Sequence, residues 1–239
     1  MRSAVKLLAV LSISLFASVS FANDIYITQS GDNLDLDITQ DGTDNVIGTT
    51  GTAVSLTGDD MSFDITQTGS YNTITAVIKG DTYTGTWDIT GDSNEIDLLC
   101  SSTTTGSCDT VTLNVTATGD DNDFTINIGE TSDSDSATVA FTVTGDNNII
   151  NSTLDGTNAN ITVALNNSAS LSTNSANSDE GVAVTLDIDG DGDSAGHTVD
   201  LDITGGGGTV DVTQSGIYDN TVDLTISGDD FDVDISQSD

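Results

Sequence analysis

The chain has 239 residues, of which 39 are Asp or Glu and three are Lys or Arg, and its formal net charge at pH 7 is −36. Because binding to nucleic-acid phosphates or to anionic lipid needs clustered Lys and Arg, this composition excludes both kinds of partner. Proline is absent and aromatic residues make up 5% of the chain, so strands can keep unbroken hydrogen-bond ladders, but a large globular core is disfavoured.

Residues 1–22 have the pattern of a secretory signal peptide. Two basic residues precede an apolar run from Leu7 to Phe16, and small residues stand before a cleavage position at Asn23. The apolar run is too short to cross a bilayer as a helix, and no later segment is long enough to do so. We therefore expect an exported chain with no membrane span, secreted and extracellular or held at the cell surface.

A short turn phrase, Gln-x-Gly-x-x-Asn, recurs along the chain. Glycine adopts positive φ without steric cost, and Asn or Asp tolerates the left-handed region, so the phrase predicts a tight arc between two strands. Other copies lose the Gln but keep the turn, as at Gly91, Gly119 and Gly145. The candidate assembly residues come from the Gln-bearing copies and the last glutamine: Gln29, Gly31, Asn33, Gln40, Gly42, Asn45, Gln67, Gly69, Asn72, Gln214, Gly216, Asn220 and Gln237.

The segments between the turns alternate apolar and polar residues, as in residues 34–38, 199–203 and 231–235. Such alternation is typical of strands with one buried and one exposed face. The turns recur at roughly 11 to 15 residues, or at about twice that, so one coil of two strands and two turns takes about 22 to 28 residues. The sequence therefore predicts an all-β fold, a β-solenoid of stacked strand–arc–strand repeats.

The repeats predict one elongated domain over residues 23–239. Within it, residues 166–181 are rich in Ser, Asn and Ala and alternate poorly. This stretch is either a bulging arc or a linker, and in the second case the solenoid is broken into two parts near residue 170.

The turn phrase resembles the centre of the curlin repeat, the building block of curli fibres on bacterial surfaces. The copies at 40–45 and 67–72 match that centre in full, while the leading Ser and trailing Ala and Gln of the curlin repeat are mostly missing. The resemblance is therefore partial and degenerate, and it is clearest over residues 25–72 and 209–238. It implies a curlin-like, non-enzymatic subunit that self-assembles into extracellular amyloid fibres for adhesion or biofilm matrix. It also implies a curli-type secretion pore, a chaperone and a nucleating homologue as partners.

Glutamine is confined to the two ends of the repeat region, at residues 29, 40, 67, 214 and 237. Stacked amides form hydrogen-bonded ladders along a cross-β axis, so these ends suit head-to-tail pairing of copies; alternatively, the ends have only diverged less. Stacked Asp side chains would repel by about 0.9 kcal/mol per pair at about 4.8 Å in water. We therefore expect Ca²⁺ or acid to accelerate assembly.

Cys100 and Cys108 enclose seven small polar residues. In an exported chain a close, even pair indicates a local disulfide, which stabilises a small loop by about 2–3 kcal/mol. The sequence therefore predicts a Cys100–Cys108 disulfide.

The segment from Asp187 to Asp193 is a candidate calcium site. Asp187, Asp189, Asp191 and Asp193 alternate around glycines, as hard oxygen ligands do at the start of a calcium loop. Position 12 of such a loop is Thr198, where a bidentate Glu is wanted, and the flanks read as strands. The alternative is a solvated turn that binds no metal, so Ca²⁺ is the one cofactor for which the sequence offers a candidate.

Catalysis finds little support in the sequence. His197 is the single histidine, and no Ser-His-Asp or Cys-His set can be assembled. Two functions remain in competition: a fibre-forming subunit, and a monomeric, Ca²⁺-stabilised solenoid that acts as an adhesin or surface-binding module. A carbohydrate-active enzyme is a remote third reading, because such sites usually need aromatic platforms and Trp87 is the only tryptophan.

Overall fold

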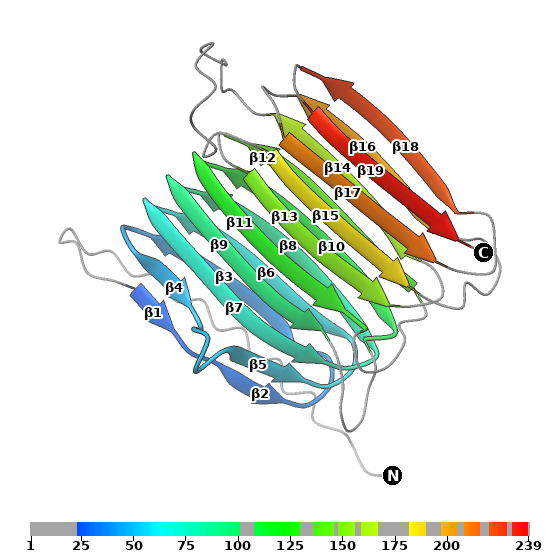
Figure 1. Ribbon diagram of the computed structural model, residues 1–239. Coiled ribbons are helices and arrows are strands. Elements are labelled where there is room, and N and C mark those ends of the chain that lie inside the picture. Colours follow the sequence, from blue (N-terminus) through cyan, green and yellow to red (C-terminus); the bar gives the residue numbers. More distant parts are fainter. Residues whose placement is uncertain are drawn as a thin grey trace, which may run out of the picture.

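The computed structural model describes residues 23–100, 108–129, 136–145, 148–155, 159–166, 182–189, 197–204, 208–215, 220–228 and 231–238. The expected signal peptide lies outside these residues. In the described part of the chain every regular element is a strand, and no helix there could cross a bilayer. The strands form two sheets, each made of parallel strands, and Figure 1 shows the sheets as two stacked layers.

The eleven-stranded sheet, here sheet A, has strands in the order β1-β4-β7-β9-β11-β13-β15-β17-β19, with β2 and β5 continuing the levels of β1 and β4. Its strands are β1 Asn23–Ile25, β2 Thr28–Ser30, β4 Asn45–Ile47, β5 Val54–Thr57, β7 Tyr71–Lys79, β9 Ser93–Cys100, β11 Asp121–Ile128, β13 Asn148–Asp155, β15 Val182–Asp189, β17 Gly208–Ser215 and β19 Phe231–Ser238. The eight-stranded sheet, here sheet B, consists of β3 Asp35–Asp41, β6 Met61–Thr68, β8 Thr82–Thr90, β10 Thr110–Thr118, β12 Ser136–Thr144, β14 Ala159–Asn166, β16 Thr198–Thr204 and β18 Thr221–Ser227.

The chain alternates between the sheets, so each coil contributes one level to sheet A and one to sheet B. Equivalent asparagines on successive coils are separated by 27, 22, 28 and 26 residues, which matches the predicted coil length. The prediction of an all-β solenoid of stacked strands is therefore confirmed. β13 pairs with β15 and β14 with β16, so both sheets continue past residues 167–181, which lie outside the described part together with most of the expected break.

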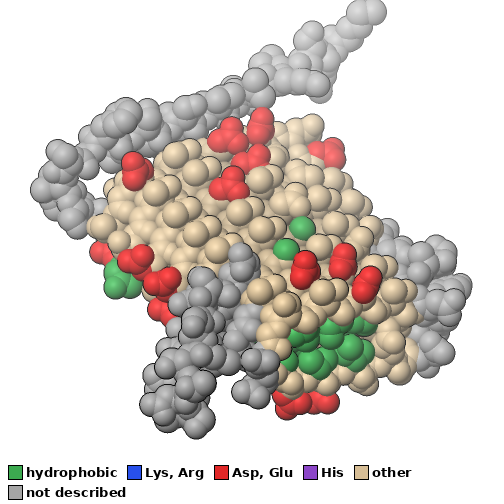
Figure 2. All heavy atoms as spheres, turned by 90° about the horizontal axis from the view of Figure 1, so that it is seen from above, with side chains coloured by type: hydrophobic (Ala, Val, Ile, Leu, Met, Phe, Trp, Pro, Cys, Tyr) green, Lys and Arg blue, Asp and Glu red, His purple; other side chains and the backbone are tan. Residues whose placement is uncertain are grey.

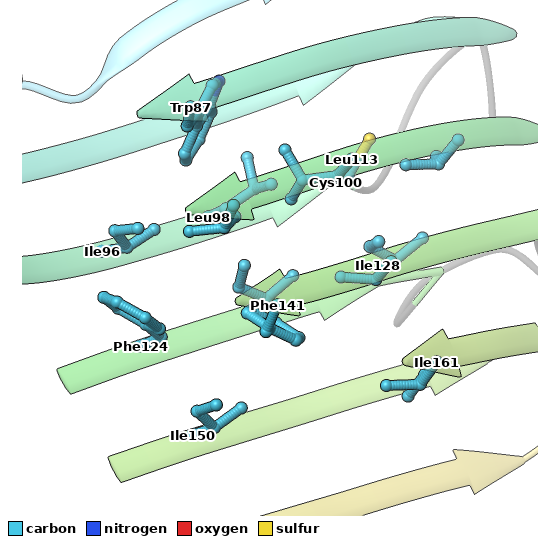
Figure 3. Close-up of a cluster of buried hydrophobic side chains, with 14 of the residues drawn as sticks. Trp87, Ile96, Leu98, Cys100, Leu113, Phe124, Ile128, Phe141, Ile150 and Ile161 are labelled. Atoms are coloured by element: carbon cyan, nitrogen blue, oxygen red, sulfur yellow. The ribbon is translucent and has the colours of Figure 1, made fainter. Parts of the chain in front are cut away.

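The strict alternation of the sequence produces the thin core between the sheets. In β10 the residues Val111, Leu113, Val115 and Ala117 point inward and are buried, while the threonines and asparagine between them are exposed. Figure 3 shows side chains from both sheets meeting in this layer. Each sheet thus hides one face from water and leaves the other wet, which is the arrangement that two-residue periodicity encodes.

The bulkiest part of the core lies around Trp87. The rings of Phe63 and Trp87 meet edge to face with centroids 5.8 Å apart, and Phe124 stacks on Phe141 at 6.2 Å. Gly85 faces the core of β8 and pairs with Leu113 of the next level, and a β-carbon on Gly85 would overlap the Tyr83 ring and approach Leu113. The missing side chain therefore leaves room for the Tyr83 ring.

The same region interrupts the regular backbone ladder between β6 and β8. The indole Nε1 of Trp87 donates to the carbonyl of Phe63 at 3.0 Å, and the backbone N–H of Thr86 donates to Oδ1 of Asp64 at 2.7 Å. Side chains therefore take over two backbone partners at this level, and the polar groups stay satisfied although the ladder is locally broken.

Tyr83 links this core to alkaline stability. Burial raises the pKa of its hydroxyl well above the ordinary value, and the negative charge of Asp64 raises it further. Unfolding releases a phenol that ionises near pH 10, so the free energy of unfolding should fall above that pH by up to about 1.4 kcal/mol per unit. We expect urea unfolding at pH 8 to 11 to show a smaller fall for Tyr83→Phe than for the parent, whereas Tyr71→Phe, at an exposed site, should fall like the parent. Equal falls in all three proteins would contradict this reading.

Candidate assembly site

An asparagine ladder runs along one edge of the core, at the arcs that lead from sheet B to sheet A. Asn45, Asn72, Asn94, Asn122 and Asn148 occupy one register column of sheet A and are buried. The Nδ2 of each donates to Oδ1 of the next, at 3.0, 2.8, 2.7 and 2.7 Å. Each amide also donates to a backbone carbonyl. For Asn45 and Asn72 this carbonyl belongs to the next coil, and for Asn94, Asn122 and Asn148 it belongs to the glycine three residues earlier in the same arc. The ladder therefore ties five successive coils together through side chains.

The glycine three residues before each of these asparagines allows the arcs to stack closely. A β-carbon on Gly119 would overlap the carbonyl oxygen of Gly91 and the amide of Asn94, and Gly91 stands in the same relation to Gly69. Glycine is needed here for close approach between arcs, which explains why Gly-x-x-Asn persists where the Gln is lost.

The glutamines form two separate pairs on different sheets. In sheet B, Nε2 of Gln67 donates to Oε1 of Gln40 at 2.7 Å, and the next level is Ile89. In sheet A, Nε2 of Gln237 donates to Oε1 of Gln214 at 2.8 Å. The glutamines at the two ends of the solenoid are therefore not all equivalent, a distinction that the turn phrase does not reveal.

Gln29 shares its column with the C-terminal pair and not with Gln40. The register runs from Gln29 through Leu56 and five further levels to Gln214 and Gln237. Gln29, Gly31 and Asn33 belong to the arc from sheet A to sheet B, and Asn33 is exposed with a φ of 61° instead of joining the buried ladder. The phrase Gln-x-Gly-x-x-Asn and its variants thus serve both kinds of arc.

Two other sequence-predicted positions differ from the ladder. Asn220 lies just before β18, where its Oδ1 accepts the backbone N–H of His197 at 3.0 Å, and Gly216 lies outside the described residues. Asn23, which the turn phrase does not include, extends the asparagine column by one level, because its Nδ2 lies 3.4 Å from Oδ1 of Asn45. The sequence signal that could have identified Asn23 is its spacing of 22 residues from Asn45, which is one coil length.

The backbone register separates several acidic side chains along each face. Asp88, for example, lies between Thr66 and Thr116, and Asp97 lies between Thr75 and Thr125. The register sets acidic residues opposite each other at five pairs of described residues: Asp37–Asp64, Glu95–Asp123, Asp155–Asp189, Asp200–Asp223 and Asp211–Asp234. Figure 2 shows one face of the molecule, where acidic side chains gather in small groups on a surface of uncharged polar atoms.

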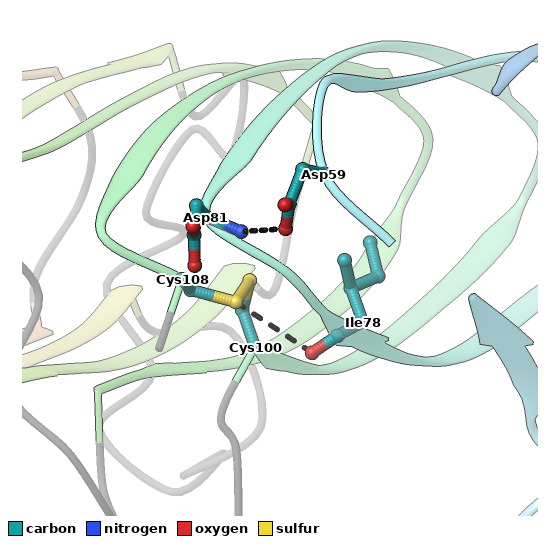
Figure 4. The surroundings of a disulfide bond; sticks show 5 residues. All are labelled: Asp59, Ile78, Asp81, Cys100 and Cys108. Atoms are coloured by element: carbon teal, nitrogen blue, oxygen red, sulfur yellow. Dashed lines mark hydrogen bonds between the residues drawn. A yellow bond between two sulfur atoms is a disulfide. The ribbon is translucent and has the colours of Figure 1, made fainter. Parts of the chain in front are cut away.

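The cysteines form the predicted disulfide. Cys100, at the end of β9, is bonded to Cys108, both side chains are buried, and Sγ of Cys108 lies 3.6 Å from the carbonyl oxygen of Ile78 (Figure 4). The bond ties the end of β9 to residue 108, just before β10, and residues 101–107 lie outside the described part of the chain.

The remaining candidate sites are the predicted calcium site and His197. Asp187 and Asp189 end β15, whereas Asp191 and Asp193 lie outside the described residues. Within the described ranges no group of three His, Cys, Asp or Glu side chains is arranged to hold a metal ion. His197 is buried, and its Nδ1 accepts the backbone N–H of Ala159 at 3.1 Å, so it acts as a structural partner between coils.

Both ends of the described solenoid are open. The inward residues of β16 are fully buried, but the inward residues of β18 and β19 are half-buried, and Ile235 is 45% exposed. At the opposite end Ile25, Ile27 and Leu34 are half-buried as well. A cluster of apolar side chains is visibly exposed in Figure 2. Each end therefore presents an unpaired strand edge beside uncovered apolar core, a combination that favours pairing with another strand.

Comparison with known proteins finds a family match in the N-terminal coils. Residues 31–69 match the family model of the curlin-associated repeat. The matched segment begins at the Gly31 arc, contains β3 to β6, and ends at Gly69. No curated protein and no solved structure matches the chain. The partial resemblance seen in the sequence is confirmed over this segment, and the chain carries a curlin-associated repeat there.

Proposed function

We propose that this protein is a secreted, non-enzymatic structural subunit that polymerises end to end into curli-like amyloid fibres outside the cell, for adhesion or as biofilm matrix. The open ends carry this proposal, because each combines unpaired parallel strands with half-buried apolar residues. The curlin-associated repeat at 31–69 supports it, since that family is structural. A secretion pore, a chaperone and a nucleating homologue are the partners that this function calls for.

End-to-end growth would also use the same kinds of contact that hold the coils of one molecule together. Parallel strands in register, a continuous asparagine ladder and paired glutamines are the contacts that stabilise cross-β stacks. A second copy added at either end extends the same contacts. Lateral approach, by contrast, brings together surfaces of a chain whose net charge is −36, and this repulsion favours long, thin assemblies.

The test uses two lysine substitutions on neighbouring residues of β18. Leu224 points inward and is half-buried at the open end, whereas Thr225 points outward and is exposed. We expect Leu224→Lys to abolish fibres at concentrations where the parent and Thr225→Lys both form them, because assembly would bury the new charge in the core. Thioflavin fluorescence and electron microscopy report the fibres, and circular dichroism checks that both variants keep the parent fold. Fibres formed equally by both variants, or a parent that stays monomeric under all conditions, would overturn the proposal.

A further inference from the structure

The two sheets have unequal numbers of levels. Sheet A has nine levels, from β1–β2 to β19, whereas sheet B has eight, from β3 to β18. The described solenoid therefore begins and ends in sheet A. This odd half-coil matters for the end-to-end assembly proposed above, on which the following inference rests.

Simple stacking of two copies leaves a vacancy. If β19 of one copy pairs with β1–β2 of the next, sheet A continues, but β18 and the next β3 are then separated by one missing strand, about twice the 4.8 Å strand spacing. The vacancy would be lined by the half-buried side chains of Val222, Leu224 and Ile226 on one side and by Leu36 and Ile38 on the other. An unfilled apolar gap forfeits the packing that such a joint should gain.

The strands at the two ends of sheet A are equivalent in sequence. Four of eight aligned positions are identical between residues 23–30, Asn-Asp-Ile-Tyr-Ile-Thr-Gln-Ser, and residues 231–238, Phe-Asp-Val-Asp-Ile-Ser-Gln-Ser. At two further positions the residues are similar, since Ile25 aligns with Val233 and Thr28 with Ser236. Their register columns are also the same, since Gln29 and Gln237 belong to one column. Either segment can therefore present the same or similar inward side chains to the same neighbour at three of the four inward positions, while Phe231 stands where Asn23 does.

We infer that copies join by strand exchange, in which β19 of one copy displaces β1–β2 of the next and pairs with its β4 and β5. Sheet A then keeps one strand at that level, and β18 pairs directly with β3 of the next copy, so both sheets continue without a vacancy. In this joint Leu224 stacks on Ile38 and Val222 on Leu36, by continuation of the columns within the molecule.

The pairing lengths decide which segment gives way. β1 pairs with β4 over three residues and β2 with β5 over three, whereas β19 pairs with β17 over eight and adds the Gln237–Gln214 amide contact. The N-terminal segment is thus held by the shorter ladders and is the one released. The exchange replaces the backbone ladders of this segment with equivalent ones, loses the amide contact of Asn23 with Asn45, and adds the β18–β3 ladder.

Single-cysteine variants, mixed in pairs and oxidised after fibre growth, distinguish the possible joints. Neighbouring parallel strands place outward-facing residues about 4.8 Å apart, within the range that a disulfide spans, and the described native cysteines are already paired. Strand exchange places Ser236 beside Ser55 of the next copy, in the position that Thr28 occupies in one molecule. It also places Thr225 beside Thr39. We therefore expect mixtures of Ser236→Cys with Ser55→Cys, and of Thr225→Cys with Thr39→Cys, to give abundant linked dimers by mass spectrometry.

The other joints predict other links. Simple stacking links Ser236→Cys to Thr28→Cys, and insertion of β1–β2 beside β17 links Thr28→Cys to Thr213→Cys. Predominance of either link, or fibres with no Ser236–Ser55 link, would overturn the strand exchange while leaving the proposed function standing. Failure of the parent and of all variants to form fibres would overturn the proposed function and the exchange with it.

Discussion

Asn94→Leu should cost the solenoid about 3 kcal/mol or more of its free energy of unfolding. Asn94 is buried in the middle of the asparagine ladder, where its Oδ1 accepts from Asn72 at 2.8 Å and its Nδ2 donates to Asn122 at 2.7 Å. Leucine has the same branched arrangement of side-chain heavy atoms but no polar ones. The substitution therefore leaves one buried donor on Asn72 and one buried acceptor on Asn122 without a partner, each costing about 1–3 kcal/mol. The carbonyls of Gly91 and Thr118 lose a donor as well.

Asn114→Leu is the matched control, because Asn114 lies in β10 with its side chain exposed on the outer face of sheet B. Urea unfolding followed by circular dichroism gives the free energy of unfolding for both variants. The control should lie within about 0.5 kcal/mol of the parent, as surface substitutions usually do. If Asn94→Leu were no more destabilising than Asn114→Leu, the amide ladder would contribute nothing to the free energy of unfolding, and apolar packing alone would hold the coils together.

The features that follow from period and turn chemistry could be predicted from the sequence. Alternation over 34–38 and 199–203 predicted strands with one buried face, and the recurring glycines placed the arcs. The coil length followed from the spacing of the turns, and Cys100 and Cys108 were close enough to pair without knowledge of the fold. These inferences depend on neighbours in the chain, for which local stereochemistry is decisive.

Features that depend on the count and register of strands could not be predicted in the same way. Gln29 and Gln40 stand in near-identical phrases, yet they lie on opposite sheets, because the phrase serves the arcs on both sides of the solenoid. Because the period varies from 22 to 28 residues, the sequence does not show whether a given arc leads from sheet A to sheet B or from sheet B to sheet A. That assignment requires the three-dimensional path of the whole chain. The Trp87–Phe63 contact, which breaks the ladder, likewise depends on which residues meet across coils.

The salt dependence of assembly should be controlled by one row of carboxylates at the proposed joint. Asp37 and Asp64 are neighbours at the first levels of sheet B, and Asp200 and Asp223 are neighbours at the last. Pairing of β18 with the next β3 brings Asp223 beside Asp37 and merges the two pairs into a row of four. The new repulsions amount to about 2 kcal/mol in water at low salt, or a factor of roughly 30 in the association constant, and they are screened over about 8 Å at physiological ionic strength.

The double variant Asp37→Asn, Asp223→Asn should therefore assemble at a concentration about tenfold or more below that of the parent at low salt, and the difference should shrink in high salt, in Ca²⁺ and at pH 4. Other acids on the same face, Asp35 and Asp41 on β3 and Asp202 on β16, are kept. The control Asp88→Asn, Asp97→Asn removes the same charge from positions flanked by threonines, so it should change assembly only slightly. Critical concentrations measured by sedimentation decide the matter. Equal gains in both double variants would mean that net charge, and not the row at the joint, opposes assembly.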